Sequence, residues 1–397
     1  MDGHSYQHEN TAINIPMRTF SGEYYSNLFQ VLDHIGIDTC IRRFEYAYRE
    51  DQKQYFRFFS NFHKVLPCLS NGILQNLYMT FLYVWWMIVL FLIPPQIITP
   101  GTNVTETETL EEYVHRARLP EKFLDWYLLP LFSSVATCSH GDLRRFPAAY
   151  ITDYIKGTFR SQHRTVVNMG FLERQLAGGA KKRFQSEVVS VSSHENKVFV
   201  DYCRCQNSTM IQEEFDYAIL ATNPTVTSQI HKASSAVTGK LQSRSVQIFV
   251  FPQQPKSLGL TQRRQSTELL ILDTSETQGM DRVTRSTHLH PSGVSVTVAA
   301  VLSHDKETQG DDLPLHSVRL WRPLPTPDSH RLLLSVFAKD RRLSNTGWKN
   351  GDGNIYLAGG YASAGLPLLE ACVRSGLEAT EAIGALLPFH LVRKTPF

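Results

Sequence analysis

Runs and periodic repeats of hydrophobic residues divide the chain into short strands and helices. Near the C-terminus, Ile355 to Ala358 form an apolar run that predicts a buried strand, and Gly359 and Gly360 follow it directly. A turn over residues 361–366 leads into a helix that we expect to carry Pro367 in its first turn, where the missing N–H costs nothing. Apolar or small residues then recur every three or four positions, which predicts one buried face. That face comprises Leu369, Val373, Gly376, Thr380 and Ile383, with Gly376 expected to pack tightly on a sheet.

This strand, glycine turn and helix can form a binding site. Their order brings free N–H groups and the positive end of the helix dipole to one point, which suits an anion or a polarised carbonyl group. The same order also occurs in ordinary β–α units with a tight turn, because glycine is common in such turns. The pattern alone leaves both interpretations open.

The middle of the chain reads as α/β. Residues 187–191 and 197–203 predict a hairpin, and Phe215 to Thr222 predict a buried strand. Residues 236–345 predict a mixed or antiparallel sheet whose strands are separated by polar loops, among them Thr274 to Ser286. The strands expected there are Val246–Phe251, Glu268–Leu272, Val294–Val301 and Arg331–Phe337.

The first third is more helical. Leu28, Val31, Leu32 and Ile35 mark the buried face of a helix. Thr109-Leu-Glu-Glu112 is a capping box, so a helix begins at about Leu110, and a second helix follows Pro120.

His140 and Asp142 form a polar pair between two of these helices. Capping and turn chemistry explains such a pair more simply than catalysis does.

The stretch from Leu77 to Ile93 carries no charged residue and ends at Pro94-Pro95. A spanning helix needs about 20 mainly apolar residues, so this stretch is at the lower limit. Three interpretations remain: a helix that dips into a membrane, one that spans it, or a buried core helix. A span would place the two ends of the chain on opposite sides of a bilayer, so we favour a helix that contacts the membrane without crossing it.

Composition excludes some classes of protein. The chain of 397 residues has 40 basic and 37 acidic residues, a net charge of +3, and this balance gives no reason to expect nucleic acid as a partner. The six cysteines form no Cys-x-x-Cys pair and no His cluster has zinc spacing, so no metal site is predicted. Because residues 1–14 are mostly polar, no signal peptide is expected, and we expect membrane association from the cytoplasmic side.

The C-terminal unit resembles the flavin-binding signature of the FAD-dependent amine oxidase superfamily. There a strand ending in Ala-Gly leads into a helix with a Glu-x-x-x-x-Ser-Gly segment, and here these are Ala358-Gly359 and Glu370 to Ser375-Gly376. The superfamily usually has an acidic residue or Ser where this chain has Gly360. The resemblance implies that the helix N-terminus, with Gly359, Gly360, Gly365 and Leu366, lies against the flavin of FAD.

Three further segments resemble the same superfamily. Pro16-Met17-Arg18 resembles a stretch near the cofactor, and Arg18 is either a cofactor contact or a surface ion pair. The resemblance implies that Val188 meets the adenine through its backbone and that Ala221-Thr222 lies near the pyrophosphate. No catalytic residue is assigned.

The superfamily's N-terminal strand and Gly-x-Gly-x-x-Gly turn have no counterpart here. None of the 23 glycines shows that spacing. The sequence given is therefore either truncated or lacks the part that binds the pyrophosphate.

The resemblance implies an α/β fold with two interleaved lobes: an N-terminally incomplete, Rossmann-like FAD-binding lobe and a substrate lobe with a mixed sheet and helices. Residues 1–30, 160–235 and 346–390 would form the first, and residues 31–159 and 236–345, including helix 77–93, the second. The implied function is FAD-dependent oxidation of a small hydrophobic or lipid-like molecule by hydride transfer, with a membrane surface as a partner. The alternative is a truncated, non-catalytic, membrane-associated flavoprotein relic. The oligomeric state cannot be read from the sequence.

Overall fold

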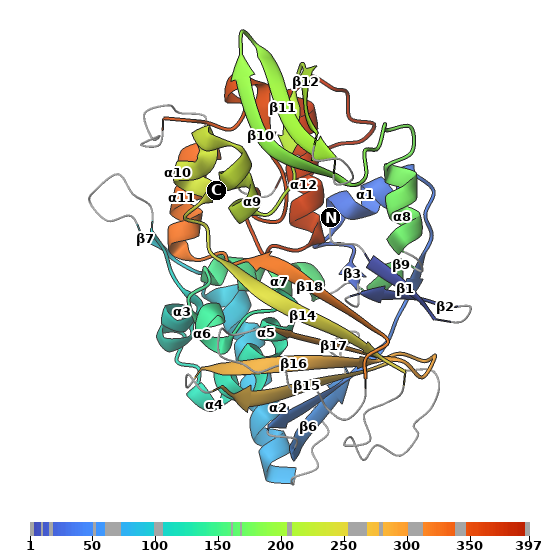
Figure 1. The fold of residues 1–397 in the computed structure, drawn as a ribbon. Coiled ribbons are helices and arrows are strands. Elements are labelled where there is room, and N and C mark those ends of the chain that lie inside the picture. The colour runs from blue at the N-terminus through green and yellow to red at the C-terminus, as the bar shows by residue number, and fades with distance from the viewer. Residues whose placement is uncertain are drawn as a thin grey trace.

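The computed structural model describes residues 4–8, 11–15, 19–50, 53–59, 73–98, 106–159, 162–166, 169–204, 209–252, 268–277, 281–300, 313–337 and 347–393. They form two lobes (Figure 1). The lower lobe holds a large sheet with helices on one side, and the upper lobe holds smaller sheets and the C-terminal helix. The α/β class and the mixed sheet are as expected from the sequence.

The large sheet has seven strands in the order β18-β14-β17-β16-β15-β5-β6. β5 and β15 are parallel, and all other neighbours are antiparallel. The strands are β5 (Phe44–Glu50), β6 (Lys53–Phe59), β14 (Ser243–Phe251), β15 (Glu268–Glu276), β16 (Arg282–Leu289), β17 (Ser295–Ala300) and β18 (His316–Pro323).

Two predicted elements in this region are wrong. The expected strand Arg331–Phe337 belongs to helix α11 (Pro327–Phe337), whose buried residues Ser329, Leu333 and Val336 recur at helical spacing. The polar stretch Thr274–Ser286 contains the end of β15 and the start of β16 rather than one loop. Thr274, Thr284 and Ser286 are buried, so these three polar residues face the interior, whereas Ser275, Glu276 and Arg285 are exposed.

Helices cover one face of the sheet, with α5 packed on β15 and β16 (Figure 1). The predicted capping box is confirmed, because Thr109 Oγ1 accepts from Glu112 N and the Glu112 carboxylate accepts from Thr109 N. The elements of this layer are α2 (Ile73–Leu92), β7 (Ile97–Ile98), β8 (Glu106–Thr107), α3 (Leu110–Arg116), α4 (Glu121–Phe123), η1 (Leu124–Leu128), α5 (Leu129–Ala136), α6 (His140–Arg144) and α7 (Ala148–Thr158).

Helix α2 has two apolar faces. Met79, Leu82, Trp86, Val89 and Leu90 are buried in the core of the helical layer. The opposite face is exposed, and we call it the α2 stripe: Leu74, Leu77, Tyr78, Phe81, Val84, Trp85, Ile88, Phe91 and Leu92. Within the described ranges, no helix has both the length and the hydropathy needed to cross a membrane.

The upper lobe contains a parallel pair of strands, β13 (Ala218–Leu220) and β19 (Ile355–Leu357), and a projecting sheet of three strands. The predicted hairpin is confirmed as β10 and β11, whereas the expected strand Phe215–Thr222 is divided between β12 and β13. The other elements of the projecting sheet and its surroundings are β10 (Ser186–His194), β11 (Lys197–Arg204), β12 (Met210–Phe215), α9 (Pro224–Ile230), η2 (Lys232–Ser234), α10 (Ser235–Thr238) and η5 (Asp352–Asn354).

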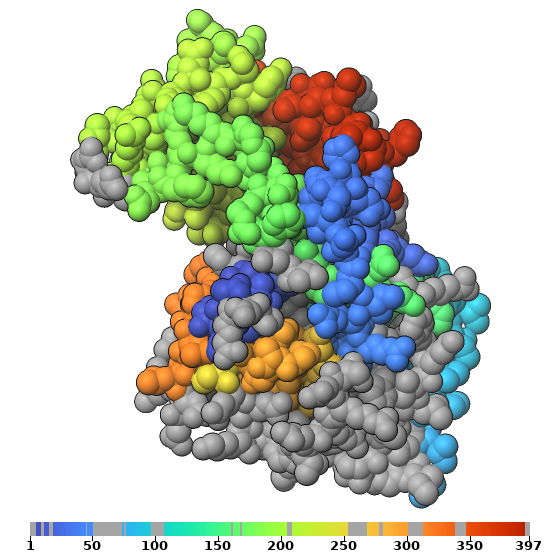
Figure 2. Space-filling view, turned by 90° about the vertical axis from the view of Figure 1, so that its right-hand side faces the viewer, coloured from blue at the N-terminus to red at the C-terminus, as the bar shows by residue number. Residues whose placement is uncertain are grey.

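Helix α12 (Leu369–Ala382) packs against α1 (Ser26–His34), so two helices far apart in the sequence lie side by side (Figures 1 and 2). The Glu370 carboxylate accepts hydrogen bonds from Asn27 N (3.0 Å), Leu28 N (3.0 Å) and Asn27 Nδ2 (2.8 Å). Glu370 therefore caps the first turn of α1, which has no side-chain cap of its own. The remaining elements near this contact are β1 (His4–His8), β2 (Thr11–Ile15), β3 (Phe20–Ser21), β4 (Thr39–Ile41), β9 (His163–Val166) and α8 (Met169–Leu176).

The predicted lobe boundaries stay a prediction, but the core clusters show where segments pack. Residues of α1, α8 and α12 share one cluster, and Leu220, Leu357 and Leu333 share another. Ile13 and Ile15 pack with β14 and β17 of the large sheet.

Candidate functional site

Two strand ends meet at the expected cofactor site. β13 and β19 are parallel, and Ala358 N donates to Leu220 O (3.0 Å). Ala221 and Thr222 therefore leave the sheet at the same edge as Gly359 and Gly360. Turns at the carboxyl ends of neighbouring parallel strands commonly hold ligands.

Hydroxyl groups connect these two turns. Thr222 Oγ1 lies 2.8 Å from Thr227 Oγ1, which in turn lies 3.3 Å from the Tyr361 hydroxyl. Asn223 caps helix α9 by accepting from Val226 N (2.9 Å), with Pro224 at the first helical position. The turn that follows β13 is thus held rigidly against the turn that follows β19.

The glycine turn needs glycine for its backbone conformation. Gly359 has φ 127° and Gly365 has φ 109°, which side-chain-bearing residues rarely adopt. A Cβ at Gly359 would make only ordinary contact, 3.5 Å from the Tyr361 ring. A Cβ at Gly360 would lie 3.3 Å from Pro367 O, so an acid at this position would require a small shift of that segment.

The helix begins later than expected. Residues 359–368 form turns and bends, and α12 starts at Leu369 rather than near Pro367, because Leu368 is extended at the N-cap position. Ser375 of the signature fixes the turn, since its Oγ accepts from Gly359 N (2.9 Å). Arg374, which is buried, donates to Ser363 Oγ and Ala364 O.

A cavity of about 130 Å³ lies where the two lobes meet. Its lining includes Phe20, Tyr25 and His163 from the upper lobe and Leu368 and Leu369 at the start of α12. The large sheet closes its other side with residues of β5, β15, β16, β17 and β18. The cavity therefore joins the start of α12 to the floor of the predicted substrate lobe.

A histidine that lines this cavity is paired with a buried carboxylate behind it. His288 on β16 lines it, and its Nε2 lies 2.7 Å from Glu268 Oε2. Burial alone would raise the pKa of Glu268, but the hydrogen bond to His288 and the charges of His288 and Arg42 hold that pKa below its usual value. Arg42 also lies 3.2 Å from Glu268 Oε1. The ionised Glu268 carboxylate accepts a hydrogen bond from His288 Nε2–H, and this bond orients the imidazole ring beside the cavity.

Among the described residues, several predicted site residues do not line this cavity. Arg18 is outside the described residues. Val188 is on β10 with 38% of its surface exposed, and it does not line the cavity. Gly360 and Gly365 line a separate, smaller cavity of about 20 Å³. Tyr150 and His330 also line it, and it lies between the glycine turn and the segment that joins β18 to α11.

The outer edge of β19 is closed by the chain itself. Gly351 N donates to Ile355 O (2.9 Å), and Leu357 N donates to Asn350 Oδ1 (2.7 Å). In the described part of the chain the sheet of β13 and β19 has these two strands only. No strand and glycine loop that could carry a pyrophosphate stands beside β19 among those residues.

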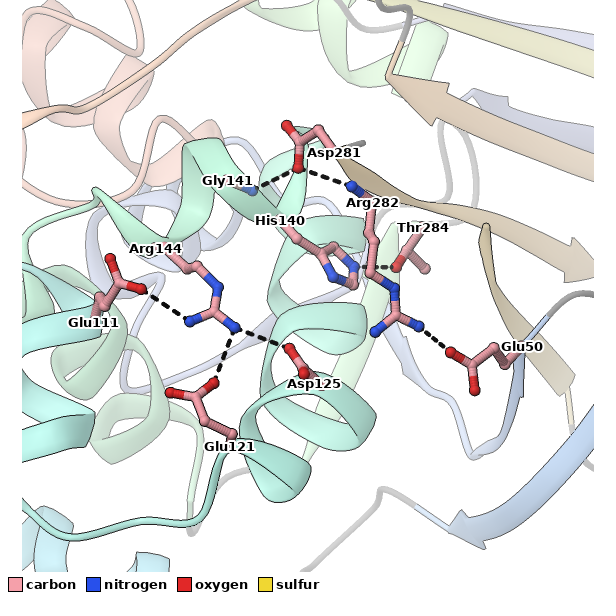
Figure 3. Close-up of polar contacts among 10 residues, drawn as sticks. All are labelled: Glu50, Glu111, Glu121, Asp125, His140, Gly141, Arg144, Asp281, Arg282 and Thr284. Carbon is pink, nitrogen blue, oxygen red and sulfur yellow. Dashed lines mark hydrogen bonds and ion pairs between the residues drawn. The ribbon is translucent and has the colours of Figure 1, made fainter. Parts of the chain in front are cut away.

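The polar pair His140 and Asp142 has a structural role. Ser139 caps α6 by accepting from Asp142 N (3.1 Å), and His140 Nε2 lies 2.8 Å from Thr284 Oγ1 on β16 (Figure 3). Burial, and then the positive charge of Arg282, lowers the pKa of His140 to about 3. The neutral ring joins α6 to the sheet, as capping and turn chemistry predicts.

Sequence reasoning missed His288, Glu268 and Arg322. The available signal was a histidine, His288, in a run of buried residues near the end of β16. The expected polar loop over 274–286 obscured the start of that strand, and Glu268 and Arg322 join it only through the sheet order.

The fold is that of flavin-dependent oxidoreductases, and the sequence resemblance pointed to the same fold. Three solved structures are similar to this chain. A CLA-producing fatty acid isomerase from P. acnes has a TM-score of 0.60 at 12% identity, covering 95% of this chain and 89% of that one. Cyclohexylamine oxidase from Brevibacterium oxydans has a TM-score of 0.54 at 12% identity, and putrescine oxidase bound to putrescine has 0.54 at 14%, each covering 96% of this chain and 90% of the other.

At these identities the likeness establishes the fold alone. No protein-family model and no curated protein sequence matches the chain.

Proposed function

We propose that the protein is an FAD-dependent oxidoreductase of the amine oxidase type that acts on a small hydrophobic molecule. The observation that carries the proposal is the cavity between the lobes, which joins the start of α12 to the sheet floor. The fold similarity to two amine oxidases supports the reaction type. Flavin, when bound, would supply the redox chemistry by accepting a hydride from the substrate.

The chain's residues fit one end of FAD better than the other. Leu368 and Leu369 at the start of α12 offer backbone groups and an apolar surface in the lining of the cavity, which suits a flavin ring. Ala221 and Thr222 lie at the neighbouring strand end. The closed edge of β19 offers no described group for the pyrophosphate. The protein's part in the reaction would be to position the substrate on the sheet floor and exclude water from it.

The second candidate is a non-catalytic flavoprotein relic, and the closed edge of β19 favours it. An enzyme that uses FAD must hold the pyrophosphate as well as the ring. A relic would keep the fold and the cavity without retaining the cofactor.

Flavin content decides between the two candidates. We expect the chain purified without added cofactor to carry little FAD, because the glycine loop is absent. Refolding with excess FAD, followed by gel filtration, should give a complex whose flavin absorbance falls on anaerobic addition of an oxidisable hydrophobic substrate. Flavin that never co-elutes with folded protein would favour the relic.

We also propose that the protein contacts a membrane surface through the α2 stripe. The stripe exposes Phe81 by 64%, Phe91 by 55% and Leu92 by 74%, with no charged residue between Leu77 and Ile93. A contiguous exposed apolar surface of this kind is typical of an interaction site. Helix α2 keeps its other face in the core, which suits contact without insertion of the whole helix.

A further inference from the structure

Two arginines bind the buried carboxylate of Asp142 on α6, and a third arginine lies beside one of them in the sheet. Asp142 Oδ2 accepts from Arg244 Nε (3.0 Å) and Nη2 (2.6 Å), and Oδ1 accepts from Arg145 (2.9 Å). Both oxygens of Asp142 are thus engaged by arginines. Arg322 stands directly opposite Arg244 in the ladder of β14 and β18.

Arg322 is the arginine left without an anion. Among the described residues it makes no ion pair, and its buried Nε has no hydrogen-bond acceptor. Like charges on directly opposite residues of two strands destabilise a sheet, and a buried donor without an acceptor adds a further cost. An anion beside Arg322 would remove both costs.

The cavity between the lobes offers the space for that anion. Arg322 lines it, together with the apolar side chains of Leu270, Val296 and Val298. No aspartate or glutamate is among the residues that line it, and the other lining groups that can carry a positive charge are His163 and His288. Arg322 is therefore the permanently charged group in this lining, and the carboxylate behind its other end, Glu268, is engaged by His288 and Arg42.

The arrangement of the strands sets the distance between Arg322 and His288, the two polar ends of the cavity. Arg322 is on β18 and His288 on β16, with β14 and β17 between them. Strands are spaced by about 4.8 Å, so three spacings separate the two residues by roughly 14 Å across the sheet. His288 is level with Val250 through Val296, whereas Arg322 is level with Arg244, six positions away on β14, which adds roughly 20 Å along the strands. The backbones of the two residues are therefore roughly 25 Å apart. Apolar residues of β17 lie between a cation at one end and a histidine at the other.

We propose that this cavity binds an apolar molecule carrying a carboxylate, with Arg322 binding the carboxylate and the apolar chain extending over Val296 and Val298 toward His288. The inference rests on the proposed function only in taking this ligand to be the hydrophobic substrate. Guanidinium and carboxylate groups match in geometry and form two parallel hydrogen bonds. An ammonium ligand would meet Arg322 as a like charge and find no carboxylate in the lining.

Three probes with one eight-carbon chain test the head group: octanoate, 1-octanol and octylammonium. Their affinities are measured by titration calorimetry on the flavin-free protein. We expect octanoate to bind about tenfold more tightly than octanol, as one charge-assisted pair would give, and octylammonium to bind more weakly than octanol. Binding to the α2 stripe would not depend on the head group in this way.

Variants locate the site. Arg322→Gln should reduce octanoate affinity to that of octanol. Arg322→Lys should retain part of the difference in affinity between octanoate and octanol. Arg319→Gln is the matched control, because Arg319 is on the same strand and is exposed. Circular dichroism shows that each variant is folded. Arg322 is half-buried and its buried Nε has no acceptor, so its replacement should not lower stability.

Equal binding of octanoate and octanol would overturn the proposal, as would an unchanged octanoate affinity in Arg322→Gln. Because no flavin is present in these titrations, their outcome is independent of whether the protein retains FAD.

Discussion

At the scale of single residues, His140 makes stability depend on pH. Its pKa is lowered to about 3 in the fold, against about 6.5 in an unfolded chain. Below pH 6.5, His140 therefore binds a proton in the unfolded state but not in the folded state. The contribution of the neutral His140 ring to the free energy of unfolding is fully present above pH 6.5. It is lost as the pH falls toward 3, by up to about 1.4 kcal/mol per pH unit.

Replacing His140 should remove this sensitivity. We expect His140→Gln to flatten the dependence of urea-unfolding free energy on pH between 6 and 4, relative to the native chain. His194→Gln is the control, because that side chain is 75% exposed. An identical slope in His140→Gln and the native chain would show that the ring is not kept neutral.

Two glycines of the C-terminal unit should respond oppositely to alanine. Gly359 has φ 127°, so Gly359→Ala should cost roughly 1–3 kcal/mol through backbone strain. Gly376 lies within α12 with nothing within 4 Å of an added Cβ, so Gly376→Ala should stabilise by about 0.5–1 kcal/mol. Thermal unfolding of the two variants tests both signs. The open space at Gly376 also shows that the expected tight packing on a sheet is wrong.

At the scale of elements, Glu370 on α12 stabilises α1. It is buried and accepts three hydrogen bonds from Asn27 and Leu28. Glu370→Ala should lower the free energy of unfolding by about 2–4 kcal/mol, because buried donors at a helix N-terminus lose a charged acceptor.

The control for this cap is Glu381→Ala on the same helix, an exposed position expected to change stability by less than about 0.5 kcal/mol. Hydrogen exchange should show faster opening of α1 in Glu370→Ala alone. Equal protection of α1 in both variants would contradict the capping role.

Helix α2 carries a prediction about membranes. The double variant Phe81→Glu/Ile88→Glu places two charges on the α2 stripe and should reduce co-sedimentation with phosphatidylcholine vesicles by at least about tenfold, since burying each apolar side chain contributes about 1.5–3 kcal/mol. The matched control, Phe171→Glu/Val189→Glu, changes exposed apolar residues of α8 and β10. Equal loss in both double variants would place the contact elsewhere.

At the scale of the whole molecule, local sequence patterns correctly predicted the helices and strands that depend mainly on neighbouring residues. The capping box at Thr109, the periodicity of α1 and the apolar run of β19 each fix an element within a few residues. Helix α11 was read as a strand because its run of three leucines masks helical spacing, although Thr326 and Pro327 mark a helix start: Ser329 N donates to Thr326 Oγ1 (3.2 Å).

The cavity could not be predicted in this way. Side chains from at least nine separate segments line it, among them Phe20 and Arg322. These segments come together only through the sheet order and the packing of the lobes. The resemblance pointed to the turn at Gly359 but carried no information on Glu268 or His288. Non-local contacts of this kind leave no periodic trace in the sequence.

The cap on α1 has a consequence for synthesis of the protein. Asn27 and Glu370 are 343 positions apart, so the ribosome makes α1 long before the carboxylate that completes it. At about 5–20 residues per second, roughly 20–70 s pass between the two. During that interval the first turn of α1 must rely on water or on a chaperone, and the segment around α1 can reach its final state only after Glu370 has been made.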